Sequence, residues 1–310
     1  MNTPSEVSSA LPSLRPPLRG AGPPAWFWLW LLTGWLGRAW AGTAVIYPAA
    51  QSSLDPRHDD LIELVRSALE QTAREDGPYT MVPSKVAMSP SRVFVELQRG
   101  ELVNITWGST SVERERDFLP IRIPLRKGLL GYRLALIRQN QQPRFDAVNN
   151  LADLQKMAVG QGLGWGDGKL YQTNGFRVVS ADYERLFAMV AAGRFDFFPR
   201  GLNEVFSEFD QRTRELPGLA VEQGLVLYYP WPEYCFFRRM DTQLAGRIER
   251  GLRRMLADGS YERWFEQWNG EWIKRARLQE RRLIRLVNPF LPKETPLDDP
   301  ALWYHPQVGK

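Results

Sequence analysis

Two hydrophobic periods alternate along residues 44–270. Short apolar runs, such as residues 44–47 and 129–137, have the length and composition of buried strands. Between such runs lie segments of helical period, and in residues 57–75 one face carries Leu61, Ile62, Val65, Leu69 and Thr72. Strands that alternate with helices predict an α/β fold, in which each sheet is mostly parallel and helices cover its faces.

The pattern predicts strands at residues 44–48, 79–82, 102–107, 129–137, 158–160, 177–179, 219–229 and 234–237, and helices at 57–75, 91–99, 151–157, 182–192 and 242–257. Residues 271–285 are basic and are predicted to form one more helix. Residues 288–306 contain five prolines, which excludes a regular helix or a central strand. Apolar residues in this segment favour an ordered strap packed on the body, with a partner-docking tail as the alternative: Phe290, Leu291, Leu302, Trp303 and Tyr304.

The first 41 residues have the pattern of a secretory signal peptide. Arg15 and Arg19 precede an apolar run at residues 25–37, which is too short to span a bilayer comfortably. Ala39 and Ala41 then supply the small residues of a cleavage site. We therefore expect cleavage after Ala41 and export to the periplasm, with an uncleaved membrane anchor as the alternative.

Composition narrows the possible functions. The chain has 310 residues, is 44% hydrophobic and 24% charged, and carries a net charge of +5, too weak an excess to indicate a nucleic-acid partner. Its single cysteine, Cys235, excludes an intrachain disulfide. The two histidines, His58 and His305, belong to no Ser/His/Asp set and no metal-ligand spacing. We therefore expect neither a catalytic centre nor a cofactor.

Candidate binding chemistry follows the strand at residues 102–107. Ser109 and Ser111 lie on a flexible turn, and Arg114 comes three residues later. In open α/β sheets ligands bind beyond the carboxyl ends of strands, and a guanidinium is suited to a carboxylate. The alternative is that residues 113–116, Glu-Arg-Glu-Arg, are only a solvated charged face.

The chain resembles the type II periplasmic solute-binding proteins of the amino-acid-binding kind, family 3. Residues 109–114 match the hydroxyl and arginine positions of that family, and residues 118–121 are a looser match to its Phe-Ser-x-Pro-Tyr-like segment. Residues 257–261, Ala-Asp-Gly-Ser-Tyr, with Trp264 and Trp268 resemble its closing motif. The resemblance implies two α/β lobes joined by a two-strand hinge, with crossings near residues 132–136 and 227–234. The implied boundaries are 42–133 and 230–270 for lobe 1, 134–229 for lobe 2 and 271–310 for a C-terminal extension.

The resemblance also implies a ligand site in a cleft between the lobes. We expect it to comprise Tyr47, Trp107, Ser109, Ser111 and Arg114 from lobe 1, and Trp165, Asp167 and Arg200 from lobe 2. The glycine-rich residues 160–168 fit neither the dinucleotide pattern nor the Walker pattern, so a nucleotide is not expected.

The ligand class depends on one departure from the family. Its second lobe normally offers an Asp to an α-ammonium group, but here the loop reads Pro199-Arg200-Gly201, and Glu204 falls in a following segment that looks helical. The sequence therefore favours a small anionic or dicarboxylate-like solute. An amino acid, with Asp167 holding the ammonium, is the alternative.

The expected protein is a monomer that binds its ligand for a membrane permease. A sensory role, docking on a receptor, and a dehydratase-like enzyme on the same fold are the further alternatives.

Overall fold

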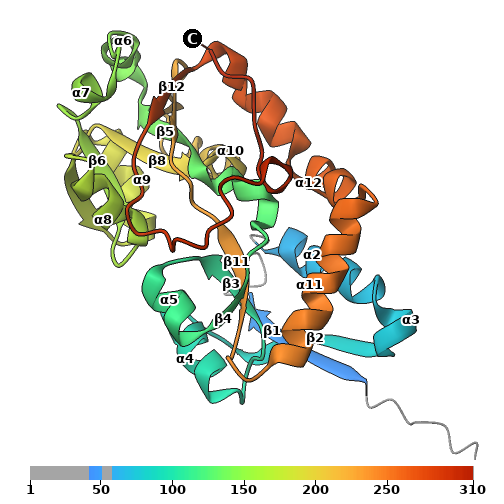
Figure 1. Ribbon diagram of the computed structural model, residues 1–310. Helices are drawn as coiled ribbons and strands as arrows, with labels where there is room; N and C mark the ends of the chain where they lie inside the picture. Colours follow the sequence, from blue (N-terminus) through green and yellow to red (C-terminus); the bar gives the residue numbers. More distant parts are fainter. Residues whose placement is uncertain (1–41, 51–57, 310) are drawn as a thin grey trace, which may run out of the picture. The chain divides into compact units, whose positions relative to one another are not determined.

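Three sheets organise residues 42–50 and 58–309, which are those that the computed structural model describes (Figure 1). The predicted signal peptide and its cleavage site lie outside the described residues. We call the elements of the two smaller sheets lobe 1 and those of the seven-stranded sheet lobe 2. Lobe 1 consists of β1 (Thr43–Ala49), β2 (Tyr79–Ala87), β3 (Thr106–Ser109), β4 (Leu119–Ile121), β11 (Glu233–Phe237), α2 (Asp59–Glu70), α3 (Ala73–Asp76), α4 (Pro90–Arg99), α5 (Val112–Asp117) and α11 (Thr242–Ala257).

In lobe 1, β1 pairs with β2 in parallel, and β11 lies between β3 and β4, antiparallel to both. The amphipathic face of α2 buries Leu61, Leu64, Val65, Ala68 and Leu69. Helix α11 packs against α2 at Gly251, where a Cβ would lie 2.0 Å from the carbonyl oxygen of Ala68. Only glycine permits this close approach of the two helices.

Lobe 2 consists of β5 (Tyr132–Arg138), β6 (Ala158–Gly162), β7 (Arg177–Ala181), β8 (Phe197–Gly201), β9 (Leu219–Val221), β10 (Leu225–Tyr228), β12 (Arg282–Arg285), α6 (Gln142–Asp146), α7 (Leu151–Leu154), α8 (Gly166–Thr173), α9 (Tyr183–Ala191) and α10 (Leu202–Arg212), with the short turn η3 (Gln139–Gln141). The strand order is β12-β10-β5-β8-β6-β7, and β9 also pairs with β5. Strand β5 is almost wholly buried, as its apolar sequence predicted.

The α/β fold is confirmed, but the prediction of mostly parallel sheets was wrong. β5 is antiparallel to β8, β9 and β10, whereas β6 is parallel to β7 and β8. β5 and β11 follow the first two places where the chain crosses between the lobes, and each enters its sheet against the direction of its partners. A third crossing leads through α12 (Ser260–Ala276) to β12. Direction at a crossing depends on tertiary path, which hydrophobic period does not encode.

The prediction of a helix over residues 271–285 was also wrong. Helix α12 (Ser260–Ala276) ends before Arg277, which has a left-handed backbone (φ 46°), and after the turn η4 (Leu278–Glu280) residues 282–285 form β12. The buried Arg281 guanidinium donates hydrogen bonds to the carbonyl oxygens of Ala276 and Glu222, both at 2.6 Å. These bonds hold the chain at the sheet edge, where β12 pairs in parallel with β10.

The proline-rich segment packs on the body, as the strap interpretation predicted. The C-terminal strap, residues 288–309, is drawn dark red in Figure 1 and contains one helical turn, η5 (Pro300–Leu302). Leu302 and Trp303 are buried, and the Trp303 indole donates a hydrogen bond to the Pro296 carbonyl at 2.7 Å.

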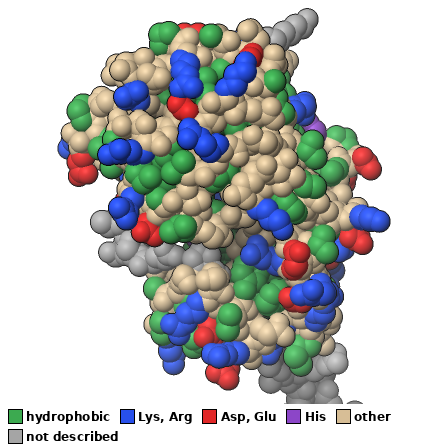
Figure 2. Space-filling model, turned by 90° about the vertical axis from the view of Figure 1, so that its left-hand side faces the viewer, with side chains coloured by type: hydrophobic (Ala, Val, Ile, Leu, Met, Phe, Trp, Pro, Cys, Tyr) green, Lys and Arg blue, Asp and Glu red, His purple; other side chains and the backbone are tan. Residues whose placement is uncertain are grey.

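Charged side chains divide into exposed and buried sets. On the face in Figure 2, Lys and Arg side chains stand in separate groups among neutral surface. Among the described residues, no helix is both long and apolar enough to cross a membrane. Buried charges are the less expected feature, because they are costly unless paired. The buried charged residues include Asp60, Arg126, Arg133, Asp167, Arg200, Glu208 and Glu233.

Candidate functional site

The end of β3 and the start of α5 build the first part of the candidate site. Ser111 caps α5, and its hydroxyl accepts a hydrogen bond from the Arg114 backbone N–H at 3.1 Å. Arg114 turns back along β3: its Nη1 donates to the carbonyl oxygen of Ser109 and lies 3.4 Å from the Ser109 hydroxyl. The guanidinium carbon lies 4.1 Å from the centre of the Phe94 ring. Three predicted site residues are therefore brought together.

Arg114 has no carboxylate within ion-pair distance among the residues that the structure describes. The two residues that follow it do form ion pairs. Glu115 pairs with Arg122, and the exposed Arg116 pairs with Asp117 at 2.7 Å. Burial lowers the pKa of Arg114 from its ordinary value. A half-buried, positively charged group of this kind is stabilised by an anion. The solvated-face alternative fits Glu113 and Arg116, which are exposed, but not Arg114.

The predicted aromatic residues lie in two separate groups. In lobe 1, Tyr47 on β1 stacks on Trp107 of β3, with ring centres 6.2 Å apart and planes at 28°. In lobe 2, Trp165 immediately precedes α8 and stacks on Phe198, with ring centres 6.2 Å apart. The Arg200 guanidinium lies over the same indole, 4.8 Å from its centre.

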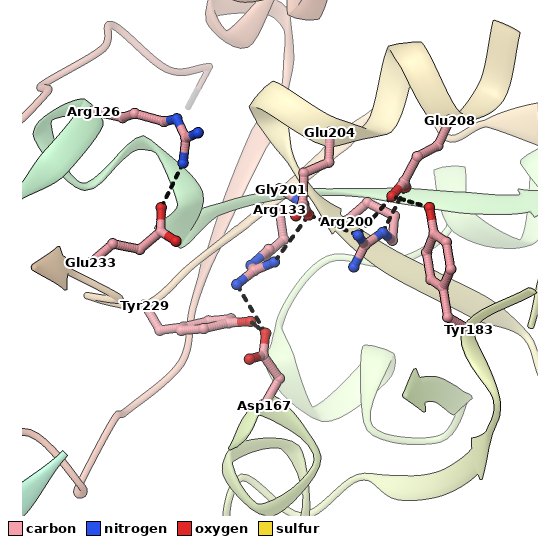
Figure 3. A network of polar contacts seen from close by, with 10 residues as sticks. All are labelled: Arg126, Arg133, Asp167, Tyr183, Arg200, Gly201, Glu204, Glu208, Tyr229 and Glu233. Carbon is pink, nitrogen blue, oxygen red and sulfur yellow. Dashed lines mark hydrogen bonds and ion pairs between the residues drawn. The ribbon is translucent and has the colours of Figure 1, made fainter. Parts of the chain in front are cut away.

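A buried chain of ion pairs joins the lobe 2 residues (Figure 3). Arg200 on β8 makes two hydrogen bonds to Glu208, at 2.6 and 2.7 Å, and lies 3.0 Å from Glu204. Arg133 on β5 lies 2.9 Å from Asp167 and 3.8 Å from the same Glu204. Arg200 and Asp167, both expected in the site, are therefore already paired within lobe 2.

Two tyrosines complete this part of the network. The Tyr229 hydroxyl donates to Asp167 at 2.6 Å, and the Tyr183 hydroxyl donates to Glu208 at 2.7 Å. Glu204 differs from its neighbours because 27% of its side chain is exposed. Burial acts to raise the pKa of Glu204, but the nearby Arg200 and Arg133 outweigh this effect and hold it below the ordinary value. Glu204 is therefore a charged acid with one side open.

A second buried group lies where the chain crosses between the lobes. Arg126 donates two hydrogen bonds to Asp60, at 2.5 and 2.6 Å, and one to Glu233 at 2.8 Å. Glu233 on β11 is directly opposite Ser109 in the β3–β11 ladder. Residues opposite each other in an antiparallel pair project to the same face. Glu233, and with it the Arg126 group, therefore lies on the Ser109 face of this ladder, whereas the Arg114 guanidinium lies over the rings of Phe94 and Phe236.

Sequence reasoning missed most of these buried ionisable residues. One signal was available: Arg133 and Glu233 each interrupt or begin an apolar strand, and a charge in such a strand is rarely buried without a partner. Among the described residues, the ion pairs of the two groups together contain five carboxylates and three guanidiniums. Burial, reinforced by Glu204 and Asp60 against the opposing effect of Arg126, raises the pKa of Glu233. The junction thus has an excess of acidic groups.

Glu233→Gln is expected to change how stability depends on pH. The pKa of Glu233 in the folded protein is raised above its ordinary value of 4.5, so the folded state binds this proton more tightly than the unfolded state. That contribution to the free energy of unfolding is present at low pH and is lost as pH rises from 4.5 through the raised pKa. Gln does not titrate, so the variant does not undergo this loss of stability. Its free energy of unfolding, measured with denaturant, should therefore increase relative to that of wild type as pH rises.

Glu204→Gln is the matched control and should behave oppositely. Because the folded-state pKa of Glu204 is lowered, its ionised form stabilises the protein above the ordinary Glu pKa, and that contribution is lost as pH falls. This variant should be less stable than wild type at neutral pH and approach it in acid. Three superimposable pH profiles would contradict the charge assignment.

Comparison with known proteins bears on the fold. No protein-family model matches the sequence, and no curated protein is similar to it in sequence.

Within the described part of the chain, no group of three or more His, Cys, Asp or Glu is placed to hold a metal ion.

Solved structures do share the architecture. The chain is similar to a probable amino-acid ABC transporter extracellular-binding protein of Bacillus subtilis, with 17% identity and a TM-score of 0.56 over 74% of this chain and 99% of that one. It is also similar to an ancestral arginine-binding protein bound to glutamine, with 16% identity and a TM-score of 0.53 over 73% of this chain and 98% of that one. A third similar structure is a histidine kinase sensor domain with similarity to periplasmic binding proteins, with 17% identity and a TM-score of 0.51 over 74% of this chain and 95% of that one. The chain therefore has the two-lobed α/β fold of the type II periplasmic solute-binding proteins.

Proposed function

We propose that this protein binds a small organic solute between its lobes, with a carboxylate of the solute on Arg114. The observation that carries the proposal is the state of Arg114, which is half-buried, held by Phe94 and Ser109, and not paired with any described carboxylate. Ser109 and Ser111 supply hydroxyl groups beside it. Tyr47, which is half-buried and stacked on the buried Trp107, supplies an aromatic ring in the same lobe.

The charges favour a zwitterion over the dicarboxylate that the sequence favoured. A dianion needs a second unpaired cation, but Arg200 is bound by Glu208 and Glu204. The junction has more carboxylates than guanidiniums, and the partly exposed Glu204 suits an ammonium group. One structural neighbour is an arginine-binding protein and another a probable amino-acid ABC transporter extracellular-binding protein, which agrees with a zwitterionic ligand. We therefore propose an amino-acid-like solute, with Glu204 in the role that the sequence assigned to Asp167.

Mass spectrometry of solute released from the purified protein tests the proposal most economically. We expect a chemically unchanged molecule with one carboxylate and one cationic group. Calorimetry with the common L-amino acids, succinate and glutarate then ranks the classes. Binding of succinate or glutarate, but of no amino acid, would reinstate the dianionic ligand. Recovery of a dehydrated product would favour the enzyme alternative.

Export is part of the proposal. We expect a mature monomeric chain that begins at Gly42 and delivers solute to a permease. N-terminal sequencing of protein from the cell envelope checks this, and a membrane-bound chain that retains residues 1–41 would contradict it. The sensor-domain neighbour keeps a receptor-docking role as the second candidate. A kinase or cyclase encoded beside this protein, rather than a permease and an ATPase, would favour that role.

A further inference from the structure

Residues 126–128 form an unusual turn at the crossing from lobe 1 to lobe 2. This turn lies within η2 (Leu125–Gly131), and three consecutive residues have left-handed φ angles: 51° at Arg126, 51° at Lys127 and 67° at Gly128. Arginine and lysine rarely adopt this conformation, because the Cβ atom crowds the following carbonyl oxygen. Such residues persist only where their surroundings hold them. The contacts that hold the turn therefore indicate its structural role.

The inner side of the turn presents Arg126 to the site. Its guanidinium bridges Asp60 of α2 and Glu233 of β11. Lys127, the next residue, points elsewhere and pairs with Glu262 of α12 at 2.6 Å. The left-handed backbone thus separates two adjacent basic side chains, sending one into the buried junction and the other to its edge.

The outer side of the turn is covered by the C-terminal strap. The Trp303 ring lies directly on Gly128, where a Cβ would come within 2.5 Å of the indole. The Tyr304 backbone N–H donates to the Lys127 carbonyl at 2.8 Å, and the Tyr304 carbonyl accepts from the Tyr132 hydroxyl at 3.0 Å. The strap therefore contacts both the turn and the first residue of β5.

The strap also contacts lobe 2 and the second crossing. Phe290 lies under the Lys169 ammonium of α8, with 4.7 Å between the nitrogen and the ring centre. Asn288 donates a hydrogen bond to the carbonyl of Pro230, between β10 and β11, at 2.9 Å. In Figure 1 the dark red segment passes from β12 across the region between the lobes to α12. One segment thus touches the first two crossings.

We propose that the C-terminal strap is a positioning element of the solute site. Trp303 and Tyr304 hold the left-handed turn, the turn sets Arg126 between Asp60 and Glu233, and the charge balance at the junction follows from that placement. Docking of the strap is in this way coupled to solute affinity. The part that concerns affinity rests on the proposed function, whereas the coupling of strap and turn does not.

A double-mutant cycle tests the coupling without any ligand. Gly128→Ala adds a methyl group where Trp303 lies, so it should shift the denaturant midpoint strongly in wild type and much less in a Trp303→Ala background. The conformational cost of Ala at this φ is present in both backgrounds and cancels in the cycle. Equal shifts in the two backgrounds would overturn the proposal. Trp303→Leu replaces Trp303→Ala if the latter fails to fold, and Leu297→Ala, an exposed strap position, is the control.

A binding measurement tests the link to the site. With L-arginine and L-glutamine as probes, Trp303→Ala is expected to weaken the binding shown by wild type roughly tenfold, within the usual range of coupling between sites. The temperature is one at which both proteins are fully folded, and Trp303→Phe should restore most of the affinity. Unchanged affinity in folded Trp303→Ala would contradict the positioning role. If wild type binds neither probe nor any solute, the proposed function fails, while the cycle still decides whether the strap holds the turn.

Discussion

Arg114→Ala is expected to weaken solute binding by about 2–5 kcal/mol, the usual effect of removing one partner of a buried charge pair. The solute carboxylate would remain in the closed site without a cation, and much of the loss is the cost of leaving that charge unpaired. Calorimetry with the solute identified from the purified protein measures the change. The folded state should survive, because Arg114 makes no ion pair with a described residue that its removal would leave uncompensated.

Arg116→Ala is the matched control for this prediction. It removes an arginine from the same short helix, but Arg116 is exposed, and within the described part of the chain its side chain forms an ion pair only with the neighbouring Asp117. Its effect on affinity should be close to zero. Arg114→Lys should recover part of the loss, because the charge is kept while the two-pronged geometry is lost. Similar affinities for wild type and Arg114→Ala would remove Arg114 from the site.

Arg133→Met is expected to destabilise the folded protein by about 3–5 kcal/mol, as for breaking a buried ion pair by removing one partner. Arg133 is buried on β5 between Asp167 and Glu204, and its removal leaves Asp167 with only the Tyr229 hydroxyl as a hydrogen-bond donor among these residues. Chemical denaturation followed by circular dichroism measures the free energy of unfolding.

The comparison variants separate charge from side-chain volume. Arg177→Met replaces an exposed arginine on β7 of the same sheet and should have almost no effect. The double variant Arg133→Met/Asp167→Asn removes both charges and should be more stable than Arg133→Met alone. A double variant less stable than the single one would show that Asp167 is not held there by Arg133.

Much of the fold could be predicted from local pattern. Most of the predicted strands and helices are present, although the strand predicted at residues 219–229 is divided into β9 and β10 and the helix predicted at 57–75 into α2 and α3. The closing motif at residues 257–261 lies at the junction of α11 and α12. Two other features were mispredicted because they depend on partners distant in sequence. β5 takes its direction from its path between the lobes, and β12 forms because Arg281 bonds to carbonyls as far away as Glu222.

The site was predictable only where its residues are close in sequence. Ser109, Ser111 and Arg114 lie in one strand–turn–helix segment, and the structure brings them together. Arg200 was expected to face an anion because its partner Glu208 lies two turns into the following helix, where no local pattern reveals the pairing. Arg126 was not identified at all, since a left-handed arginine has no signature in hydrophobic period.

The claim that solute lies between the lobes and contacts both can be tested directly by hydrogen–deuterium exchange with and without the identified solute. The account predicts slower exchange in residues 108–114 of lobe 1 and, at the same time, in residues 200–204 of lobe 2. The strap around Trp303 should be protected together with them, while α7, which lies on the part of lobe 2 away from lobe 1 in Figure 1, should be unaffected. Protection confined to one lobe, or found only outside these segments, would contradict it.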